Sequence, residues 1–437
     1  MNRGKKNPSI ARPVYVVDGS RTPFLKARSH PGPFSASDLA VFSGQALLNR
    51  QPFSPQDLDE VILGCIIPSE NEANIGRIVA LRLGCGNAMP GWTVQRNCGS
   101  GMQAIDSALK DIAMGRADLV LAGGTESMSH APLMFNAKMV KWFADLQQAN
   151  SIGKKLKVFA KLRPGFLAPI ISLIHGLTDP LHDLIMGKTA EILAYEFNIT
   201  REEMDAFAMR SHQRLATAHD EGWLKEIVPI YDHQGKYYDH DDGVRRDTSM
   251  QSLAGLKPIF DRPFGWVTAG NSSQVTDGAA TVLLASEDAI KKYSLPILGR
   301  IVDVEWAALS PTVMGLGPVF ASTPLLLRNN LSVEDIDYWE INEAFAAQVL
   351  ACLKAWQSDA FCHEHFGLSS ALGDIDPARL NVDGGAVALG HPVGASGARI
   401  VLHVLEVMKR HHAQRAIAAI CIGGGQGGAM LLERSEG

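Results

Sequence analysis

The stretch Asn97-Cys98-Gly99-Ser100-Gly101-Met102 joins a short apolar run to a segment with helical spacing of apolar residues. Its glycines permit a sharp turn and leave space beside the thiol. A similar stretch, Ala395-Ser396-Gly397, opens another helical segment near the end of the chain. Each segment is followed by an apolar run and a glycine pair, at Gly123-Gly124 and at Gly423-Gly424. The repeated order predicts two similar halves.

Apolar runs rich in β-branched residues alternate with helical stretches along both halves. Asn71-Glu72-Ala73 and Asn342-Glu343-Ala344 precede two of these helices and extend the repeat. The predicted strands are Val14–Val17, Val61–Leu63, Leu119–Ala122, Val282–Ala285, Tyr338–Ile341 and Ala416–Cys421. The predicted helices include Met102–Met114, Ala346–Trp356 and Ala398–Lys409. This alternation favours an α/β fold whose sheets are covered on both faces.

Size and charge limit the class of protein. The chain has 437 residues and a net charge of −5, so it exceeds one ordinary domain and offers no reason to expect a nucleic-acid partner. No apolar run is long enough to span a membrane, and the first ten residues lack the apolar core of a secretory signal. The six cysteines have no metal-type spacing, so we expect reduced thiols and a cytoplasmic protein.

A different kind of sequence lies between the halves, roughly from Ser129 to Phe260. Seven Lys or Arg residues occur between Lys138 and Arg163, against the single acid Asp145. Thr200 and Glu203 form a capping-box pattern that predicts a helix running toward His219. We expect this block to be an inserted, mostly helical domain on the side of the active site.

Cys98 is the first candidate for chemistry. A helix beginning just after it would direct free N–H groups and a partial positive charge at the sulfur. We expect this environment to lower the pKa of the thiol and to favour the nucleophilic thiolate. The alternative is an inert, half-buried cysteine at a tight turn.

His391 and Cys421 are two further candidates. Glycines on both sides and Pro392 place His391 on a rigid loop, where it could act as a base for a thiol or donate to a thioester oxygen. Cys421 ends a predicted strand, and a second thiol facing the first could shuttle a proton. The alternatives are a loop histidine bound to backbone groups and a small residue filling a crowded strand end.

Two further motifs resemble a dinucleotide-binding unit and a metal site, but the surrounding sequence argues against both. Gly423, Gly425 and Gly428 match a dinucleotide fingerprint, but Ala429–Glu433 is predicted to be a strand and the chain then ends, so no helix completes the unit. Cys362-His363-Glu364-His365 has adjacent rather than spaced ligand types, which is more typical of a solvated loop than of a metal site. We therefore expect no metal and no nicotinamide cofactor.

Taken together, the motifs resemble the thiolase family over nearly the whole chain. The motifs are Arg21-Thr22-Pro23-Phe24, Asn97–Gly101, Gly123–Ser129, Met186–Glu191, Thr268–Ser273, Thr276–Ala280, Asn342–Ala346, Gly390-His391-Pro392 and Cys421–Gly425. The resemblance implies two βαβαβαββ halves in a five-layered α/β/α/β/α sandwich with an inserted loop domain. We expect the N-terminal half at 9–129 plus 261–295, the loop domain at 130–260 and the C-terminal half at 296–437. The resemblance also implies that the protein forms a homodimer or a homotetramer.

The resemblance further implies a division of roles in the site. Cys98 would carry the acyl group, His391 would activate it, and Cys421 would be the acid/base. Asn342 would hold a water that forms one oxyanion site with His391, and the backbone N–H groups of Cys98 and Gly423 would form the other. The contacts to substrate or coenzyme A would come from Met186, Ser273, Phe345 and Ala269. Coenzyme A and acyl-CoA are then substrates, and no resident cofactor is implied.

The implied reaction is ping-pong cleavage of a 3-oxoacyl-CoA by coenzyme A through an acyl-Cys98 intermediate. Ile185 stands where many biosynthetic thiolases have His, and Lys154–Pro169 resembles the long loop of the beta subunit of trifunctional beta-oxidation complexes. This favours fatty-acid beta-oxidation and a complex with a hydratase/dehydrogenase subunit. Asn342, where that subgroup often has His, argues against it. The alternatives are an acetoacetyl-CoA thiolase working in the condensing direction, another condensing enzyme of the same fold, and a silent acyl-CoA-binding subunit.

The basic and apolar segment Lys138–Leu177 leaves two interpretations open. A cationic, amphipathic segment could dock on a membrane surface or on a partner subunit. Alternatively, it is a loop-domain helix packed on its own protein, with lysines near the phosphates of coenzyme A. We favour the packed helix.

Overall fold

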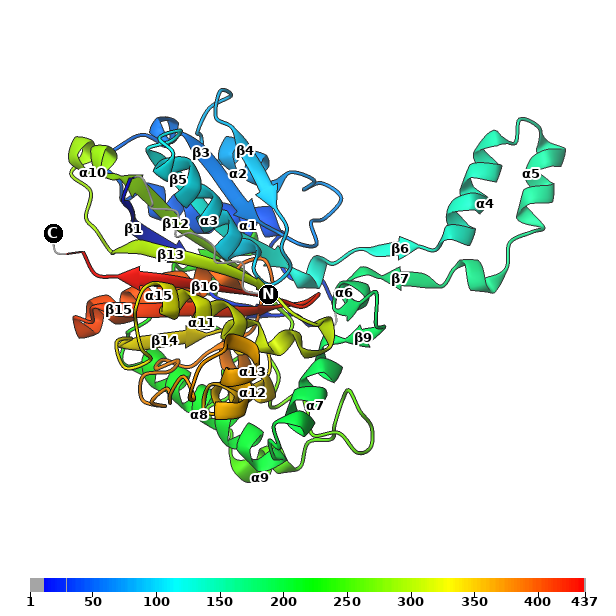
Figure 1. Ribbon diagram of the computed structural model, residues 1–437. Coiled ribbons are helices and arrows are strands. Elements are labelled where there is room, and N and C mark those ends of the chain that lie inside the picture. Colours follow the sequence, from blue (N-terminus) through cyan, green and yellow to red (C-terminus); the bar gives the residue numbers. More distant parts are fainter. Residues whose placement is uncertain (1–11, 29, 436–437) are drawn as a thin grey trace.

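The computed structural model describes residues 12–28 and 30–435 (Figure 1). Three predictions lie outside the described residues: the one for the first ten residues, the start of the N-terminal half at residues 9–11, and the end of the C-terminal half at residues 436–437. Among the described residues, no helix is long and apolar enough to cross a membrane.

The N-terminal half alternates strands with helices and closes on two antiparallel strands. β3 pairs in parallel with β4 and β5, and β12 lies antiparallel between β5 and β1. Each parallel pair is joined by a helical crossover, as its geometry requires. The elements are β1 (Val14–Arg21), α1 (Ala36–Leu48), β3 (Glu60–Gly64), α2 (Ile75–Arg82), β4 (Gly91–Val94), α3 (Ser100–Ala113), β5 (Leu119–Ser127) and, beyond the inserted block, β12 (Thr276–Ser286). The short β2 (Leu25–Lys26) pairs with the start of β12.

The C-terminal half repeats this order. The elements are β13 (Gly299–Ala308), α11 (Gly317–Arg328), β14 (Tyr338–Ile341), α12 (Ala346–Trp356), α15 (Ser396–His411), β15 (Arg415–Ile422) and β16 (Gln426–Glu433). The third strand is reduced to an isolated parallel bridge between Trp339 and Leu380. β1 and β13 even share an irregularity at the same place, just after Val16 and just after Ile301. The predicted internal repeat is therefore confirmed, with one strand shortened.

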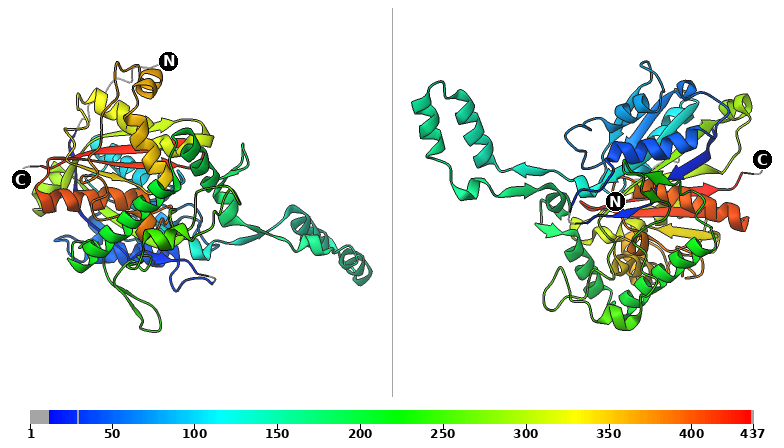
Figure 2. Two further views of the ribbon diagram at one scale, coloured as in Figure 1. Left: turned by 90° about the horizontal axis from the view of Figure 1, so that it is seen from below. Right: turned by 180° about the vertical axis from the view of Figure 1, so that it is seen from behind.

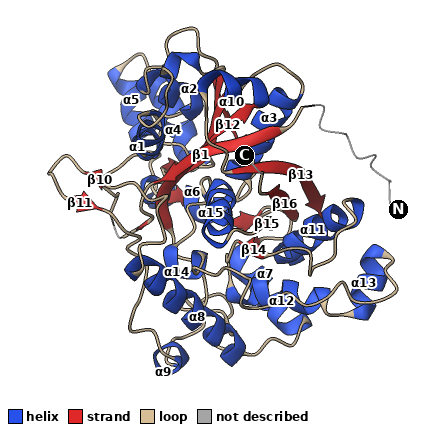
Figure 3. Cartoon of the chain, turned by 90° about the vertical axis from the view of Figure 1, so that its left-hand side faces the viewer, coloured by secondary structure: helices blue, strands red, loops and turns tan. Residues whose placement is uncertain are grey.

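The layers of the fold are defined by the helices that pack on each face of the strands. In β5, Val120 and Ala122 pack with α3 and α15, whereas Leu119 and Leu121 pack with α1 and α2. On the strands of the C-terminal half, one face packs with α3 and α15 and the other with α11 and α12. This gives the five layers that the family resemblance implies (Figure 3). β1 and β13 also pair over two residues, so the two β layers join into one hydrogen-bonded sheet.

α15 shows how completely the central layer is enclosed. Its residues are buried on all sides from Ser396 to Val404, because the helix lies between the strands of both halves (Figure 3). The buried stretch also includes Arg399 and His403, whose side chains pair there with the buried carboxylates of Glu340 and Glu226. The layer places the starts of α3 and α15, and therefore the two stretches that decided the fold, beside one another.

The inserted block consists of helices and three small two-stranded sheets. α7 (Met186–Glu196) and α8 (Arg201–Asp220) pack on the C-terminal half, and the predicted capping box of Thr200 and Glu203 starts α8. The remaining elements are α6 (Ser172–Gly176), β8 (Thr178–Asp179), β9 (Leu184–Ile185), β10 (Ile230–Tyr231), β11 (Tyr237–Tyr238) and α9 (Met250–Ala254). Outside the block, the short helices are α10 (Glu287–Tyr293), α13 (Asp359–Phe366) and α14 (Ala386–Leu389).

One part of this block leaves the body of the molecule. β6 (Leu133–Phe135) and β7 (Pro169–Ile171) form a ribbon that carries α4 (Ala137–Gln148) and α5 (Ile152–Phe159) away from it (Figures 1 and 2). We call residues 133–171 the arm. The expectation of a helix packed on its own protein is wrong, because α5 has no buried residue and α4 buries only Met139 and Trp142.

Two local predictions also differ from the structure. Gly123-Gly124 lies inside β5 rather than after a strand, since the strand continues to Ser127. Cys362–His365 lies within α13 rather than in a solvated loop, with Cys362 buried. By contrast, β16 confirms that a strand follows the glycines after Cys421, so the dinucleotide unit is absent from this part of the described chain.

Candidate active site

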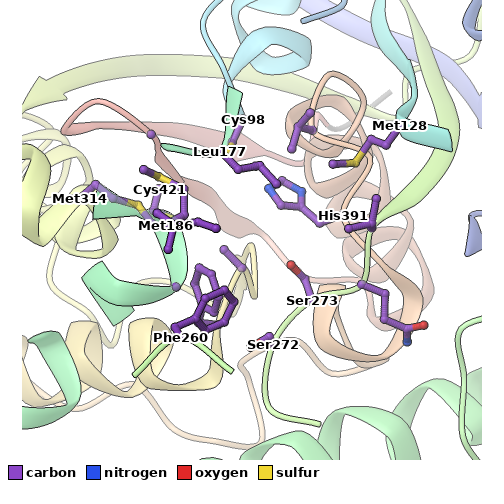
Figure 4. A pocket seen from close by; sticks show the side chains of 18 residues that line it. Cys98, Met128, Leu177, Met186, Phe260, Ser272, Ser273, Met314, His391 and Cys421 are labelled. Carbon is purple, nitrogen blue, oxygen red and sulfur yellow. The ribbon is translucent and has the colours of Figure 1, made fainter. Parts of the chain in front are cut away.

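A cavity of about 210 Å³ opens where the two halves meet the inserted block (Figure 4). The predicted site residues that line it are Cys98, His391, Cys421, Gly423, Met186, Ser273 and Phe345. Two predicted residues do not line it: Ala269 is exposed, and Asn342 is fully buried at the end of β14. The structure thus brings together residues that are more than three hundred positions apart in the sequence.

Cys98 is presented by a tight turn before α3. Asn97 adopts a left-handed backbone conformation, with φ of 42°, and its side-chain amide donates to the carbonyl of Gly423 at 2.8 Å. The Ser100 hydroxyl donates to the Asn97 carbonyl at 2.7 Å and accepts from the backbone N–H of Arg96 at 2.8 Å. These bonds brace the turn from both sides and tie it to the C-terminal half.

The expected lowering of the Cys98 pKa is wrong. Burial raises the pKa of this thiol to about 11, although the backbone N–H groups of Gly423 and of Cys98 itself act in the opposite direction. The start of α3 therefore does not by itself produce a thiolate. Burial destabilises the charged thiolate more than the backbone N–H groups stabilise it. Cys98 needs a base to become a nucleophile.

His391 has the geometry of that base. Gly390 before it has φ of 104°, and a side chain there would collide with Thr276, so only glycine fits. The Ser396 hydroxyl donates to the Pro392 carbonyl at 3.0 Å and lies 2.6 Å from His391 Nδ1. Because its proton is committed to Pro392, the hydroxyl accepts from Nδ1–H. Nε2 is then the unprotonated nitrogen, and it is buried without a hydrogen-bond partner in the described structure.

The charge state of His391 agrees with this tautomer. Burial, and secondarily the positive charge of Arg399, lowers the pKa of His391 to about 3. The imidazole is therefore neutral at physiological pH and has a free lone pair on Nε2. A proton taken from a neighbouring thiol would make it an imidazolium beside the resulting thiolate.

Cys421 reaches the same cavity from the end of β15. Burial, and secondarily the neighbouring thiols of Cys98 and Cys352, raises its pKa well above the ordinary value. The thiol is therefore protonated at rest, which suits a proton donor rather than a nucleophile. Gly424 and Gly425 follow with φ of 87° and 77°, and this turn aims the N–H of Gly423 at Cys98.

Asn342 is held behind the cavity with one unused donor. Its side-chain carbonyl accepts from Arg399 at 3.5 Å, and its Nδ2 has no partner among the described residues. Arg399 in turn pairs with Glu340, and all three side chains are buried. A buried amide with a free N–H is costly unless a water or a ligand atom accepts from it.

Several residues that the structure places in or behind the site were not among the predicted ones. Ser396 orients His391, and the buried carboxylate of Glu126 accepts from the N–H groups of Ile66, Ile67 and Gly394 at 3.0–3.1 Å. Ser396 and Glu126 both lie inside motifs of the sequence, but no role in the site was predicted for either residue. Further apolar lining residues come from separate short segments and carry no local signal; they are Met128, Leu177, Phe260, Val275 and Met314.

Among the described residues, no Asp, Glu, Lys or Arg lines the cavity, and His391 is neutral. Among the described residues, no group of three or more His, Cys, Asp or Glu is placed to hold a metal ion. The arrangement offers a half-buried nucleophile, a neutral base, a protonated acid and free N–H groups within apolar walls. These are the components of covalent acyl transfer.

Comparison with known proteins agrees with that class. The family model "Thiolase, N-terminal domain" matches residues 14–288, and "Thiolase, C-terminal domain" matches residues 295–434. The chain belongs to the thiolase family and is an acyltransferase.

Individual relatives cover nearly the whole chain. A 3-ketoacyl-CoA thiolase of Yersinia pestis (strain Pestoides F) is 35% identical over 426 residues, which is 96% of each chain. The structure of human mitochondrial 3-ketoacyl-CoA thiolase in complex with CoA is 36% identical with a TM-score of 0.83, covering 99% of this chain and 100% of that one. The Bacillus anthracis acetyl-CoA acetyltransferase is 35% identical with a TM-score of 0.82, covering 97% and 99%.

Proposed function

We propose that the protein is a 3-ketoacyl-CoA thiolase, which cleaves a 3-oxoacyl-CoA with coenzyme A into acetyl-CoA and an acyl-CoA shortened by two carbons. The observation that carries this proposal is the presence of two thiols and one neutral histidine in a single apolar cavity. One thiol has a base available, and the other is a proton donor. Cleavage of the bond between C2 and C3 needs both.

In the first half-reaction, His391 Nε2 takes the proton of Cys98, and the thiolate attacks the 3-keto carbonyl of the substrate. The oxyanion is stabilised by the backbone N–H groups of Cys98 and Gly423, which already face the sulfur. When the C2–C3 bond breaks, its electron pair forms the enolate of acetyl-CoA. Cys421 protonates C2 of that enolate and becomes a thiolate.

The enolate oxygen needs its own donors while it carries charge. His391, now protonated on Nε2, supplies one, and a water held by the free amide of Asn342 supplies the other. In the second half-reaction the thiol of coenzyme A gives its proton to Cys421 and attacks acyl-Cys98. The departing Cys98 sulfur recovers its proton from His391, so the site returns to its starting state.

The apolar lining supports a substrate with an extended acyl chain and a role in fatty-acid beta-oxidation. Ile185, Met128 and Leu177 all line the cavity, so the position at which biosynthetic relatives have His is apolar here. A competing proposal, an acetoacetyl-CoA thiolase working in the condensing direction, is supported by the equal similarity to the Bacillus anthracis acetyl-CoA acetyltransferase. A ketoacyl synthase would need a second histidine in place of Cys421.

Assembly and partners belong to the same proposal. β4 is the last strand in the order of the large sheet and its four residues are only half-buried, which leaves an edge that a second copy could extend. We propose a homodimer through this edge, with a homotetramer as the larger alternative. The domain boundaries, the cytoplasmic setting and a complex with a hydratase/dehydrogenase subunit stay predictions.

The decisive experiment follows the absorbance of 3-ketoacyl-CoA substrates after coenzyme A is added, in a series from acetoacetyl-CoA to 3-oxopalmitoyl-CoA. We expect absorbance to fall for the whole series and kcat/KM to be higher for the longer chains. Turnover of acetoacetyl-CoA alone would favour the competing proposal. No absorbance loss with any substrate would refute both.

A further inference from the structure

The helix α15 carries a polar stripe inside the central layer of the fold. Ser396, Arg399 and His403 are spaced by three and four residues, so their side chains share one face of the helix. All three are buried. Charged side chains are rarely kept at such positions unless they are paired there. The partners of the stripe therefore indicate what each member does.

The far end of the polar stripe ties elements of the fold together. His403 lies 2.9 Å from a carboxylate oxygen of Glu226, in the inserted block, and 3.4 Å from one of Asp383, in the C-terminal half. Although burial acts in the opposite direction, these carboxylates raise the pKa of His403 to about 10. Neither of them lines the cavity. This end of the stripe holds α15 in place and takes no part in the site.

Arg399 lies in the middle of the stripe and contacts two residues at the end of β14. Its guanidinium pairs with Glu340 through Nη1 and donates from Nη2 to the side-chain carbonyl of Asn342 at 3.5 Å. The backbone of Asn342 is fixed separately, because its N–H donates to the Ala419 carbonyl at 2.9 Å. Only the side-chain amide of Asn342 remains to be oriented.

The chemistry of the guanidinium decides that orientation. A guanidinium has five N–H donors and no acceptor, so it attracts the amide oxygen of Asn342 and repels the amide N–H groups. The oxygen and the nitrogen of a planar amide point in different directions. Nδ2 of Asn342 therefore faces away from Arg399, and it has no partner among the described residues. Without the guanidinium, the amide could turn over and present an acceptor where a donor now lies.

We propose that Arg399 is a positioning residue for thiolysis, which turns the Asn342 amide so that its N–H, and not its oxygen, holds the water of the enolate site. This inference rests on the proposed function, in which that water stabilises the enolate oxygen together with His391. A water that accepts from Nδ2–H keeps both of its hydrogens and becomes a stronger donor. A water held by the amide oxygen would donate one hydrogen to the amide and would be a weaker donor to the enolate.

Glu340 keeps Arg399 in this pose. Burial raises the pKa of Glu340, although the charge of Arg399 acts in the opposite direction. Removing one partner of a buried ion pair leaves an uncompensated charge and strongly destabilises a fold. A test of Arg399 must therefore remove both charges together, as Arg399→Met/Glu340→Gln does.

The test compares thiolysis with the exchange of labelled coenzyme A into acetyl-CoA, which forms no enolate. We expect Arg399→Met/Glu340→Gln to lower the kcat of thiolysis at least about ten-fold with KM nearly unchanged. Exchange should change by less than about two-fold, the usual limit for sites that do not interact. A change in stability alone would lower both activities together.

A combination with Asn342→Ala shows whether Arg399 acts through Asn342. Asn342→Ala should lower the kcat of thiolysis by about 10²-fold, since it removes the donor that holds the water. Asn342→Ala/Arg399→Met/Glu340→Gln should lose no more than Asn342→Ala, because the amide that Arg399 orients is already gone. If Arg399→Met/Glu340→Gln does not fold, Arg399→Lys gives the same comparison. A lysine keeps the charge pair with Glu340 but lacks the second arm that reaches Asn342.

The matched control is Arg21→Met/Asp241→Asn. Arg21 and Asp241 form an ion pair that is as deeply buried as that of Arg399 and Glu340, and neither lines the cavity. This variant should lower the free energy of unfolding and leave the ratio of thiolysis to exchange unchanged.

Three results would overturn the role of Arg399 while wild-type thiolysis remains intact. They are an equal loss of thiolysis and exchange in Arg399→Met/Glu340→Gln, additive losses in combination with Asn342→Ala, and the same change of ratio in the control. An inactive wild type would instead refute the proposed function, and the role of Arg399 with it.

Discussion

The two halves of the molecule share one plan but contribute different chemistry. Each has a helix of the central layer that begins with a serine, Ser100 in α3 and Ser396 in α15, and each serine hydroxyl donates to a carbonyl of the preceding turn. In the N-terminal half that hydroxyl accepts from the backbone N–H of Arg96 and braces the turn carrying Cys98. In the C-terminal half it meets the side chain of His391 instead.

The strands that follow these helices differ in the same way. β5 continues through its glycines and remains a strand as far as Ser127, with Glu126 buried in the scaffold. β15 ends at Ile422, and the chain then turns sharply, so that the Cys421 thiol and the Gly423 N–H reach the cavity. The two halves thus have equivalent helix starts. Local differences place the nucleophile Cys98 beside the start of α3 and the base His391 beside the start of α15.

Removing the nucleophile from the N-terminal half is expected to have the largest effect. Cys98→Ala should abolish thiolysis, because no covalent intermediate can form. It should also abolish the exchange of labelled coenzyme A into acetyl-CoA, which needs only acyl transfer to the thiol. Cys362→Ala, which removes a buried cysteine outside the cavity, is the control and should retain both activities. Substantial thiolysis by Cys98→Ala would disprove the mechanism.

Removing the acid from the C-terminal half should separate the two activities. We expect Cys421→Ala to lower the kcat of thiolysis by about 10²- to 10⁴-fold, the usual contribution of a general acid. The same variant should lose much less of its coenzyme A exchange activity, because exchange involves no carbon–carbon bond and no enolate and uses Cys421 only to pass a proton to and from the thiol of coenzyme A. Equal loss of exchange and thiolysis would show that Cys421 is needed for the fold or for acyl transfer rather than for protonation.

The two equivalent serines give a matched pair. Ser396→Ala should lower kcat about ten-fold with KM nearly unchanged and shift the pH profile of kcat, because His391 loses the acceptor that selects its tautomer. Ser100→Ala should instead lower the free energy of unfolding by about 1 kcal/mol and leave the pH profile in place. Steady-state kinetics across pH and urea unfolding measure the two effects. Identical pH profiles for Ser396→Ala and the wild type would remove Ser396 from the mechanism.

Glu126 should give the smallest effect. Burial raises the pKa of this carboxyl to about 7 from 4.5, so between these values the folded protein holds a proton that the unfolded chain releases. Stability must therefore fall as pH rises through this window. Glu126→Gln removes the titration, and we expect the free energy of unfolding to depend less on pH across this window. Urea unfolding near both ends of the window checks this; parallel curves for variant and wild type would contradict it.

The sequence predicted most of the architecture because its signals were local. The strands from Val14 to Cys421, the helices after Gly101 and Gly397 and the capping box at Thr200 follow from apolar spacing and cap chemistry, and the structure contains each of them. Seven of the nine predicted site residues line one cavity. The arm was misjudged because its apolar spacing is the same as that of a packed helix, and spacing does not reveal whether a partner surface exists.

By itself, the sequence determined the family, the internal repeat and the residue types of the site, because motifs, apolar spacing and glycines are local patterns of the sequence. Only the tertiary structure decided how those residues behave. It raised the pKa of Cys98 by burial where a helix start alone predicted the opposite, and it left Nε2 of His391 free by placing Ser396 beside Nδ1. It also left the arm uncovered. Burial and partner choice depend on which distant segments come together, and no local pattern contains that information.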